Sequence, residues 1–560
     1  MKFNKKLFSL LMFVMLICCV SVASATDLDN ITVPDDTNII ADDIVESVDD
    51  VEIDDVVDDV DDVASEDNVS ESINDVEITD DVSESVDDVE ITDEKIPSGG
   101  DRAYVTPSSY YRYFTSAGVL RSTTSLPLIF NGYFNNMPFD YFEINRATTI
   151  NAATATFNNV GFKFTAGNIT INGGTFTTTA STNVNHVIDI TAGDAEVNGV
   201  TMNLTAPKNK EFVAINVAGG TNAKILNNVI TYTCTYSNAG YINYVIRVKN
   251  SPNTVISGNT ITAYLPLKDV AYYVGETDMD WDQVAVVGIE NSNGFNLSYN
   301  NINVNVTNIT GSYPTLDSVI VLDSEDAYIG HNNVTEIDNV TQPGSANYLY
   351  AIDVYRCNHL NIDDNIIKLR SMGGTYIVGT NNGTSTAYGI QLTGGHNVTI
   401  TNNDIDTRNN GPNAGIYSQN FGGETNLTIV NNTIYVEGNA GSHQWSLVTG
   451  MELQDDFGYI AGNKIKVLNK QGYVPGSNAY GISFSQWGIR NPVFNITNNC
   501  VNLINGDYAV YIQSSEPTTY VTDNCLTSTN YVGDYAVYPA TNVYISGNHN
   551  CTCTNCPVHP

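Results

Sequence analysis

Apolar and polar residues alternate along short segments that recur through most of this chain. In the segment Asn-Val-Thr-Ile-Thr-Asn-Asn-Asp-Ile, which ends at Ile405, Val398 and Ile400 point to one side of an extended strand. Asn402 and Asn403 then bend the chain, because Asn adopts the left-handed backbone conformation at little cost. Ile405 returns to the inner side on the next strand. The pattern therefore predicts two short strands that meet at a corner.

The reduced pattern Ile-x-x-Asn-x-Ile returns at an interval of about 32 residues. A fixed period of this size is typical of a solenoid, in which each unit buries its apolar side only against its neighbours. Stacked units would align the asparagines in a column, and each amide would donate to the next, about 4.8 Å further along the axis. The asparagines of this predicted ladder are Asn228, Asn259, Asn300, Asn332, Asn365, Asn403, Asn432, Asn463, Asn499, Asn524 and Asn548.

A second alternating motif, such as Tyr-Gly-Ile-Gln-Leu around Ile390, precedes the first in each unit. In five repeats its inward residue lies ten positions before the first Ile or Leu of the asparagine motif. Several short strands per unit, an asparagine ladder and no helical period predict an all-β fold, the single-stranded right-handed parallel β-helix. The five pairs are Ile215/Ile225, Ile246/Ile256, Val287/Leu297, Ile352/Ile362 and Ile390/Ile400.

The first hundred residues differ from the repeats. Residues 1–25 are typical of a secretory signal, because lysines precede an apolar run and small residues permit cleavage near Ala25. Residues 26–97 are of low complexity, with 29 Asp and Glu and no Lys or Arg between Asp27 and Glu94. We expect a disordered, extended acidic stalk there, since like charges among spaced Val and Ile cannot offset the chain entropy. A repeat that orders on calcium is the alternative.

Residues 98–150 are expected to cap the solenoid, and residues 151–560 to form its coils. Pro107 fits the first position of a helix and Gly118 its end, so we expect a helix from Pro107 to Ala117 over the open sheet edge. The net charge of -39 excludes a nucleic-acid or anionic-membrane binder. No apolar run of spanning length follows the signal, so we expect no transmembrane span in the mature chain.

The acidic repeats, the segment Tyr-Val-Thr-Pro-Ser-Ser-Tyr-Tyr-Arg-Tyr-Phe at 104–114 and the Asn-Asn-x-Ile coils together resemble the adhesin-like surface proteins of methanogenic archaea. The coils themselves are similar to the wider pectate-lyase-like β-helix superfamily. The resemblance implies a secreted or surface-exposed protein that binds glycans or neighbouring cells. In the superfamily, substrates lie along the outer face of one column of strands, which directs attention to the outward residues of the second motif.

These outward residues are polar and mixed in sign, with tyrosines toward the C-terminal end. Such a face suits sugar hydroxyls and ring stacking, and it equally suits an inert, solvated sheet. The positions directly after the inward Ile or Val read Asn216, Arg247, Gly288, Val321, Asp353, Gln391, Tyr417, Glu452, Ser483, Tyr511 and Tyr538.

Carboxylates that could serve catalysis lie on this face or near it. Asp323 and Asp353 are expected on adjacent coils, roughly 8 Å apart, within the range of an inverting glycosidase. Asp455 and Asp456 follow a Gln and are similar to the Asp pair of polygalacturonase-like hydrolases. The companion Gly-His-Gly and Arg-x-Lys motifs of those enzymes are missing here. Catalysis is therefore the secondary hypothesis.

The longest repeat contains an acidic and aromatic loop. Asp278, Asp280 and Asp282 form Asp-x-Asp-x-Asp, which opens many calcium loops because alternate carboxylates converge on one hard cation. The glycine of such loops is absent at the sixth position, so calcium binding and a solvated acidic loop both stay open. The aromatic candidates for stacking on sugar rings are Trp281, Tyr417, Trp445 and Tyr473.

Most cysteines lie close to the C-terminus. Cys500 and Cys525 each follow a ladder asparagine, so they stack on successive coils and predict a disulfide in a secreted chain. Zinc binding is the alternative for the last cysteines and histidines. Asn-x-Ser/Thr sequons, which are acceptors for glycans in secreted proteins, recur at Asn168, Asn203, Asn296, Asn305, Asn308, Asn333, Asn339, Asn382, Asn397, Asn426, Asn431 and Asn495.

These features predict a secreted, surface-displayed protein that binds carbohydrate or neighbouring-cell surfaces without turnover. A polysaccharide lyase or glycoside hydrolase acting on acidic polysaccharide is the first alternative. A purely structural cell-surface component is the second. Calcium is the one cofactor for which the sequence offers ligands in a recognisable spacing.

Overall fold

The computed structural model describes the repeats and leaves the first hundred residues out. The predicted signal peptide and acidic stalk, residues 1–97, therefore lie outside the described residues. Every described residue belongs to the unit Asp93–Pro560. The described ranges are 102–208, 210–234, 243–269, 284–310, 314–340, 347–371, 386–419, 425–440, 447–454, 456–473, 476, 478–485, 493–513, 518–538 and 542–550.

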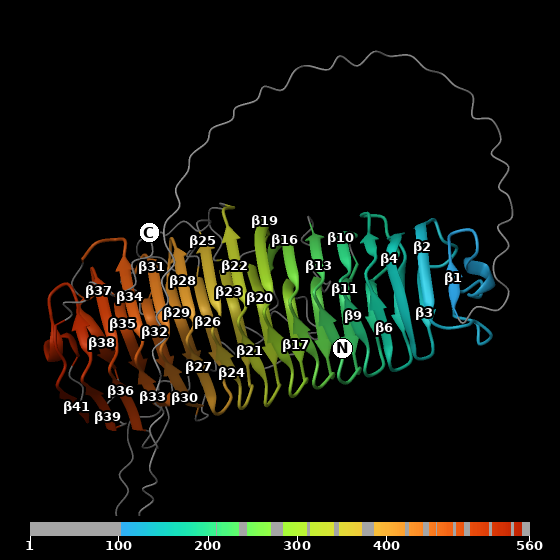
Figure 1. Ribbon diagram of the computed structural model, residues 1–560. Helices are drawn as coiled ribbons and strands as arrows, with labels where there is room; N and C mark the ends of the chain where they lie inside the picture. The colour runs from blue at the N-terminus through green and yellow to red at the C-terminus, as the bar shows by residue number, and fades with distance from the viewer. Residues whose placement is uncertain are drawn as a thin grey trace, which may run out of the picture. The chain divides into compact units, whose positions relative to one another are not determined.

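Parallel β-strands build nearly all of the described chain. From β8 to β37, each strand pairs with the strand three places further along, so one coil holds three strands. The strands succeed one another from β1 at one end to β41 at the other (Figure 1). This is the right-handed parallel β-helix that the sequence predicts. Among the described residues, no helix is long and apolar enough to cross a membrane.

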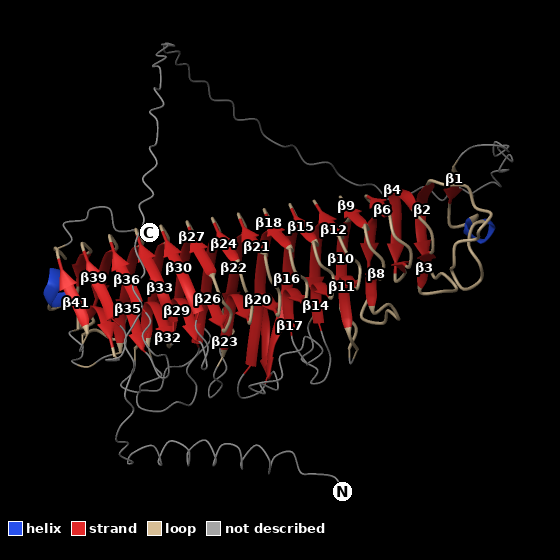
Figure 2. Cartoon of the chain, turned by 90° about the horizontal axis from the view of Figure 1, so that it is seen from below, coloured by secondary structure: helices blue, strands red, loops and turns tan. Residues whose placement is uncertain are grey.

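The strands form three stacks, which Figure 2 shows from below. The first stack precedes the asparagine corner and comprises β6 (Ile169–Asn172), β9 (Glu196–Asn198), β12 (Lys224–Leu226), β15 (Val255–Ser257), β18 (Asn296–Ser298), β21 (Tyr328–Gly330), β24 (Asn361–Asp363), β27 (Val398–Thr401), β30 (Thr425–Val430), β33 (Asp456–Ala461), β36 (Val493–Thr497), β39 (Thr518–Thr522) and β41 (Val543–Ser546). The second stack follows that corner and comprises β7 (Thr175–Thr177), β10 (Thr201–Thr205), β13 (Val229–Thr233), β16 (Thr260–Asp269), β19 (Asn301–Thr310), β22 (Asn333–Asp338), β25 (Ile366–Ser371), β28 (Asp404–Asn409), β31 (Thr433–Gly438), β34 (Lys464–Asn469), β37 (Cys500–Ile504) and β40 (Cys525–Thr527).

The third stack contains the strands of the second sequence motif. It comprises β3 (Tyr141–Ile144), β5 (Gly161–Phe164), β8 (His186–Ile190), β11 (Phe212–Ala218), β14 (Asn243–Lys249), β17 (Val284–Glu290), β20 (Pro314–Leu322), β23 (Tyr348–Tyr355), β26 (Thr386–Thr393), β29 (Asn413–Gln419), β32 (Val448–Gln454), β35 (Ala479–Ser485) and β38 (Tyr508–Ile512). The N-terminal coil adds β1 (Ala103–Val105), β2 (Leu128–Asn135) and β4 (Thr148–Asn158), and the short 3-10 turns are η1 (Tyr110–Arg112) and η2 (Gly533–Ala536).

Two residues with different roles make the corner between the first and second stacks. The residue before each ladder asparagine has a positive φ, for example 56° at Asn402 and 70° at Gly258. Asn, Asp and Gly reach this left-handed conformation most easily, which explains their frequency there. The ladder asparagine itself is buried, and Asn403 is only 1% exposed. The predicted bend at these two positions is confirmed.

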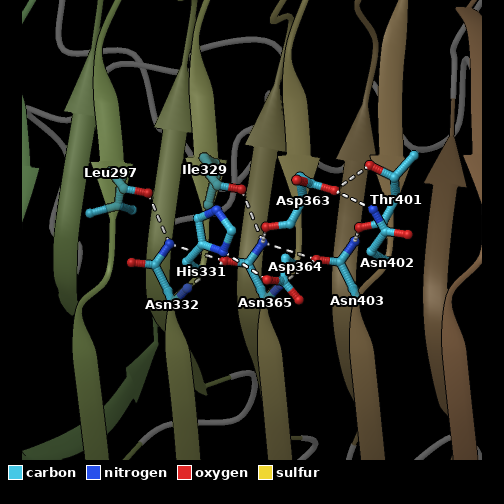
Figure 3. Close-up of polar contacts among 10 residues, drawn as sticks. All are labelled: Leu297, Ile329, His331, Asn332, Asp363, Asp364, Asn365, Thr401, Asn402 and Asn403. Atoms are coloured by element: carbon cyan, nitrogen blue, oxygen red, sulfur yellow. Dashed lines mark hydrogen bonds and ion pairs between the residues drawn. The ribbon is translucent and has the colours of Figure 1, made fainter. Parts of the chain in front are cut away.

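The ladder asparagines form one continuous column of hydrogen bonds, as the sequence predicts, and Figure 3 shows part of it. Nδ2 of Asn403 donates to Oδ1 of Asn432 and to the carbonyl oxygen of Ile362, both at 2.9 Å. Oδ1 of Asn403 accepts from Nδ2 and from the backbone N–H of Asn365, again at 2.9 Å. Each side chain thus joins three coils.

Both ends of this column are also satisfied. At the N-terminal end, Oδ1 of Asn228 accepts from the backbone N–H of Val200 at 2.9 Å. At the C-terminal end, Nδ2 and the backbone N–H of Asn548 donate to Oδ1 of Asp534 at 2.8 and 3.0 Å. Asp534 lies in η2, so this short turn closes the last rung with an acceptor.

The N-terminal end differs from the prediction in one element. A single 3-10 turn at Tyr110–Arg112 stands where a helix from Pro107 to Ala117 was expected. Consecutive aromatic residues have low helix propensity, and one of them, Phe114, packs into the end of the core here. Phe114 is fully buried and packs against Phe142, with ring centroids 4.9 Å apart. Phe114 therefore joins the core and Tyr110 and Tyr113 pack against it without a helix, whereas Tyr111 is exposed.

The column makes a direct prediction for stability. Replacing Asn403→Ala removes donors and acceptors from three coils and leaves their buried partners unpaired, so we expect the free energy of unfolding to fall by about 1–3 kcal/mol. Thr399→Ala, on the outer side of the same corner, is the matched control and should change it little. Urea denaturation of the two variants measures the difference. Equal midpoints would show that the column does not stabilise the fold.

Candidate functional site

The outer surface of the third stack, called the third-stack face below, gathers the polar residues singled out from the sequence. Strand pairing places one outward residue of every coil in a single row. Most members of this row are buried, for example Asp353 at 2% and Glu452 at 5% exposure. The row runs through Asp189, Asn216, Arg247, Gly288, Ile320, Asp353, Gln391, Tyr417, Glu452, Ser483 and Tyr511.

Strand β20 departs from the expected register by one residue. Val319 pairs with Ile352 and faces inward, so Ile320 rather than Val321 lies beside Asp353. The sequence gives no guide at this point because four apolar residues, Val-Ile-Val-Leu, follow one another without alternation. In every other coil of the row, the outward residue is the expected one.

Asp323 therefore lies three positions, not two, beyond the residue beside Asp353, so the expected spacing of the two carboxylates is not found. Their catalytic role stays a prediction. Asp323 lies in the turn after β20 with a φ of 47°. Its carboxylate accepts from Nε and Nη2 of Arg356 at 2.6 and 2.5 Å, which is a bidentate ion pair between adjacent turns. This pairing gives Asp323 a structural role at the surface.

Asp317, which the sequence analysis missed, is the carboxyl group that meets Asp353. The two side chains are 4% and 2% exposed and hydrogen-bond to each other across β20 and β23. Burial raises the pKa of both carboxyls, and the like charge of Asp317 raises that of Asp353 further. Asp353 therefore holds a proton and donates it to Asp317. Among the described residues, Oδ1 of each has no hydrogen-bond partner.

An apolar cluster borders this acid pair on its N-terminal side. It lies outside the main core, on the third-stack face, and consists of Val213, Tyr244, Ala285, Ile320, Leu322 and Tyr355. Such a border lowers the local dielectric and is a physical cause of the raised pKa values. On the C-terminal side, Nε2 of Gln391 donates to the hydroxyl oxygen of Tyr355 at 3.4 Å.

A third acid lies beneath the pair, inside the solenoid. Glu336 is 0% exposed and occupies an inward position of β22, where the neighbouring coils have Val304 and Leu369. The hydroxyl of Ser318 donates to its Oε2 at 2.6 Å. Burial raises the pKa of Glu336 well above its usual value, and the nearby charge of Asp317 adds to this. The wall between core and surface thus holds three acids that resist ionisation.

Polar side chains continue along the face toward the C-terminus. The hydroxyl of Tyr417 donates to Oε1 of Gln419 at 2.9 Å, and Nε2 of Gln454 donates to Oε1 of Glu452 at 2.8 Å. Burial raises the pKa of Glu452 to about 7. Tyr417 also stacks on Tyr388, with ring centroids 4.5 Å apart and an interplanar angle of 5°. This places the predicted binding residue Tyr417 on the face, within a polar and aromatic strip.

Five tyrosines form a connected group of rings at the C-terminal end of the face, called the tyrosine cluster below. Ring contacts of 4.3 to 5.2 Å link all five members. Tyr531 and Tyr538 are 38% and 37% exposed, whereas Tyr480 is 8% exposed and forms the base. The members are Tyr480, Tyr508, Tyr511, Tyr531 and Tyr538.

The N-terminal end of the third-stack face has no tyrosine cluster among the described residues and contains a network of ion pairs. His186 contacts Asp189 at 3.2 Å and Glu211 at 3.1 Å, and Nη1 of Arg247 lies 3.4 Å from the same Glu211. Burial lowers the pKa of His186, but its bonds to the two carboxylates outweigh this and raise it to about 9. Lys249 pairs with Glu290 at 3.4 Å. These groups neutralise one another, so this end is ordinary cross-strand pairing.

The other predicted site residues are placed only in part. Tyr473 donates its hydroxyl to Oδ1 of Asp507 at 2.6 Å, near the tyrosine cluster member Tyr508. Asp456 begins β33 in the first stack and pairs with Thr425, away from the third-stack face. Within the described ranges, no group of three or more acids, histidines or cysteines is arranged to hold a metal ion. Lying outside the described residues are Trp281, Trp445, Asp278, Asp280, Asp282 and Asp455.

The predicted disulfide between Cys500 and Cys525 is not formed. The two residues are paired in register on β37 and β40, as expected. Cys500 keeps its thiol, while Cys525 is disulfide-bonded, so the two are not joined to each other. Residues stacked in register on parallel strands lie about 4.8 Å apart with parallel side chains, which is a poor match to the Cβ separation of about 3.8 Å in a disulfide.

No family model and no curated protein matches the sequence. A mutant of the periplasmic alginate epimerase AlgG is similar in structure at 12% identity and a TM-score of 0.36, over 79% of this chain and 82% of that chain. The A-module of mannuronan C-5 epimerase AlgE6 from Azotobacter vinelandii is 12% identical with a TM-score of 0.32, over 81% of this chain and 92% of that chain. The alginate lyase AlyF-OU02 is 13% identical with a TM-score of 0.32, over 81% of this chain and 90% of that chain. At these identities and scores the likeness carries no argument about function, and the expected kinship with adhesin-like proteins gains no support from it.

The acid pair makes a prediction about pH. Carboxyls whose pKa is raised on folding bind more protons in the folded state, so stability falls as pH rises from about 4 through the raised pKa. We expect Asp317→Asn to increase the free energy of unfolding at pH 7.5 by an amount on the order of 2 kcal/mol, because it removes a buried charge. Its stability should also depend less on pH than that of the natural protein.

Urea denaturation at pH 5 and pH 7.5 measures both effects. Asp323→Asn is the matched control, since that carboxylate is paired at the surface and should leave the pH dependence unchanged. If Asp317→Asn destabilised the protein at both pH values, the pair would be an ionised, well-solvated site and its assignment as a shared-proton pair would fail.

Proposed function

We propose that this protein binds polysaccharide along the third-stack face and is anchored to it by the tyrosine cluster. The observation that carries the proposal is the group of five connected tyrosine rings, in which buried Tyr480 supports exposed Tyr531 and Tyr538. Flat, rigid rings with hydroxyl groups at their edge stack on sugar rings and hydrogen-bond their hydroxyls at low entropic cost.

The rest of the face supports the same reading. Amide and hydroxyl groups of Gln391, Tyr417, Gln419 and Gln454 form a strip that leads from the acid pair toward the cluster. The strip repeats at each coil, about 4.8 Å apart, so it presents a line of similar groups to an extended, repeating ligand. A polymer contacts many weak subsites at once, which suits such a surface.

Secretion and surface display complete this proposal. A secretory signal at residues 1–25 would direct export and be removed. The acidic stalk at 26–97 would then serve as the spacer to the attachment point, so that the protein could meet glycans of neighbouring cells. Trp281 and Trp445 are proposed as additional stacking residues, and Asp278 to Asp282 as a calcium loop, on the basis of sequence alone. Calcium dependence of binding tests the last point.

The proposal predicts the result of a binding experiment. Tyr511→Ala and Tyr538→Ala each remove a ring from the middle of the cluster, so we expect retention on immobilised polysaccharide to fall by about tenfold or more. The matched control is Tyr544→Ala. Tyr544 is 59% exposed and stacks on Tyr520 at 5.1 Å, but on the first stack. Affinity electrophoresis in gels that contain acidic or neutral polysaccharides measures the three variants side by side.

If the control lost binding and the two cluster variants kept it, the binding surface would lie on the first stack. If the natural protein bound none of a broad panel, the proposed function itself would fail. Circular dichroism of each variant separates loss of binding from loss of fold.

Acid–base catalysis on a polysaccharide is the second candidate, and the Asp317–Asp353 pair favours it. One protonated and one ionised carboxyl side by side supply a general acid and a general base, as β-elimination requires. Their direct hydrogen bond is shorter than the separation of roughly 5 to 9.5 Å between the two carboxyls of glycoside hydrolases. Their Oδ1 atoms are buried and have no hydrogen-bond partner among the described residues, so each keeps unused acceptor capacity in the wall of the third-stack face. Purified protein should then release reducing ends or unsaturated products, and Asp353→Asn and Asp317→Asn should abolish this release. Product formation that survives both substitutions would place any active site elsewhere.

A further inference from the structure

The positions of the N-glycosylation sequons distinguish the three stacks. Twelve Asn-x-Ser/Thr sequons have their asparagine among the described residues, and none of these asparagines is buried. None lies in a strand of the third stack. The twelve are Asn168, Asn203, Asn296, Asn305, Asn308, Asn333, Asn339, Asn397, Asn426, Asn431, Asn495 and Asn550.

The sequon asparagines lie in or beside the first and second stacks and at the C-terminal end. Strand positions include Asn296 on β18 and Asn426 on β30 in the first stack, and Asn203 on β10 and Asn333 on β22 in the second. Asn397 is exposed in the turn before β27 with a φ of 55°. Nine of the twelve are exposed and three are half-buried. Glycan attached at these positions would project from two of the three faces.

The third-stack face has hydroxyl residues at suitable positions for sequons, but it lacks the asparagines that would have to precede them. On outward strand positions, residues i and i+2 both face solvent, so a sequon fits there without disturbing the core. Thr165, Thr191 and Thr393 stand two places after outward residues of the third stack, but those residues are Lys, Asp and Gln. The described strands of this stack contain only Asn216, Asn243 and Asn413, and these precede Ala, Val and Gly at i+2.

The ladder is protected for a different reason. The residue two places after a ladder asparagine begins the inward alternation of the second stack, and Ile230, Ile261 and Ile405 show that it is a core position. A hydroxyl residue there would put a polar group into the apolar interior. The buried column therefore cannot coincide with sequons, whereas the exposed asparagines can carry them.

We propose that N-linked glycans cover the first and second stacks and leave the third-stack face bare for ligand. In the transfer, the side-chain nitrogen of Asn bonds to C1 of a sugar supplied by a lipid-linked glycosyl phosphate or pyrophosphate. The bond from C1 to the phosphate oxygen breaks, the lipid phosphate leaves, and the amide gives up one proton. Each modified amide keeps one N–H. The use of the bare face for ligand rests on the proposed polysaccharide binding. The predicted positions of the glycans do not depend on it.

The experiment is a glycan map of the full chain secreted from cells that carry an oligosaccharyltransferase. Peptides are deamidated by a glycan-cleaving amidase in heavy-oxygen water and sequenced by mass spectrometry. We expect label at most of the nine exposed sequons, including Asn203, Asn397 and Asn426. Absence of label at all of them would overturn the proposal, whether or not the protein binds polysaccharide.

A second arm tests the bare face with introduced sequons. Gln513→Asn creates Asn-Ser-Ser two residues after Tyr511, and Lys163→Asn creates Asn-Phe-Thr at the far end of the same face. We expect glycan at residue 513 to abolish retention on polysaccharide and its enzymatic removal to restore it. Glycan at residue 163 should leave retention unchanged.

Two outcomes separate this inference from the proposed function. If the natural glycoprotein binds polysaccharide only after its glycans are removed, the glycans cover the binding surface and the inference fails while the proposed function stands. If neither the glycosylated nor the unglycosylated chain binds, the proposed function fails, and the glycan map alone decides whether the first and second stacks are covered.

Discussion

The buried asparagine column is the interaction on which the rest of this structure depends. A tight corner exposes backbone N–H and C=O groups to an apolar interior, and each unsatisfied group would cost free energy. Every ladder amide bonds to the backbone of a neighbouring coil and to the next amide, for example from Asn403 to Ile362 and to Asn432. This fixes the position of each coil relative to the last. The corner therefore sets the register of all three stacks at once.

A fixed register has a consequence for the surface. Because each coil repeats the same corner, residues that are about 30 positions apart in sequence lie side by side on the third-stack face. Asp317 and Asp353 meet in this way, and so do Tyr480 and Tyr511. An acid pair in an apolar border opposes folding, and tyrosines on an outer strand contribute less than they would in the core. Such residues lower the stability of the fold, a cost that often accompanies functional surfaces and that fits the proposed binding of a ligand here.

The sequence reveals periodic features and misses those that break the period. Alternation and spacing were enough to predict the ladder, its corner and the outward row, because they recur in coil after coil. The four apolar residues from Val319 to Leu322 carry no alternation, so the register of β20 and the role of Asp317 were missed. The sequence nevertheless contains one sign of the buried acids in this region, since Glu336 occupies a position that is apolar in the neighbouring coils. The helix and the disulfide failed because a local motif says nothing of three-dimensional packing.

The central claim is that the third-stack face, and the tyrosine cluster above all, contacts polysaccharide. Hydroxyl-radical footprinting reads this directly, because tyrosine rings are oxidised in proportion to their exposure and bound sugar shields them. With polysaccharide present, the account predicts reduced oxidation at Tyr531 and Tyr538 and unchanged oxidation at Tyr520 and Tyr544 on the first stack. Reduced oxidation of Tyr520 and Tyr544 without reduced oxidation of Tyr531 and Tyr538 would contradict the account and would place the binding surface on another face of the solenoid.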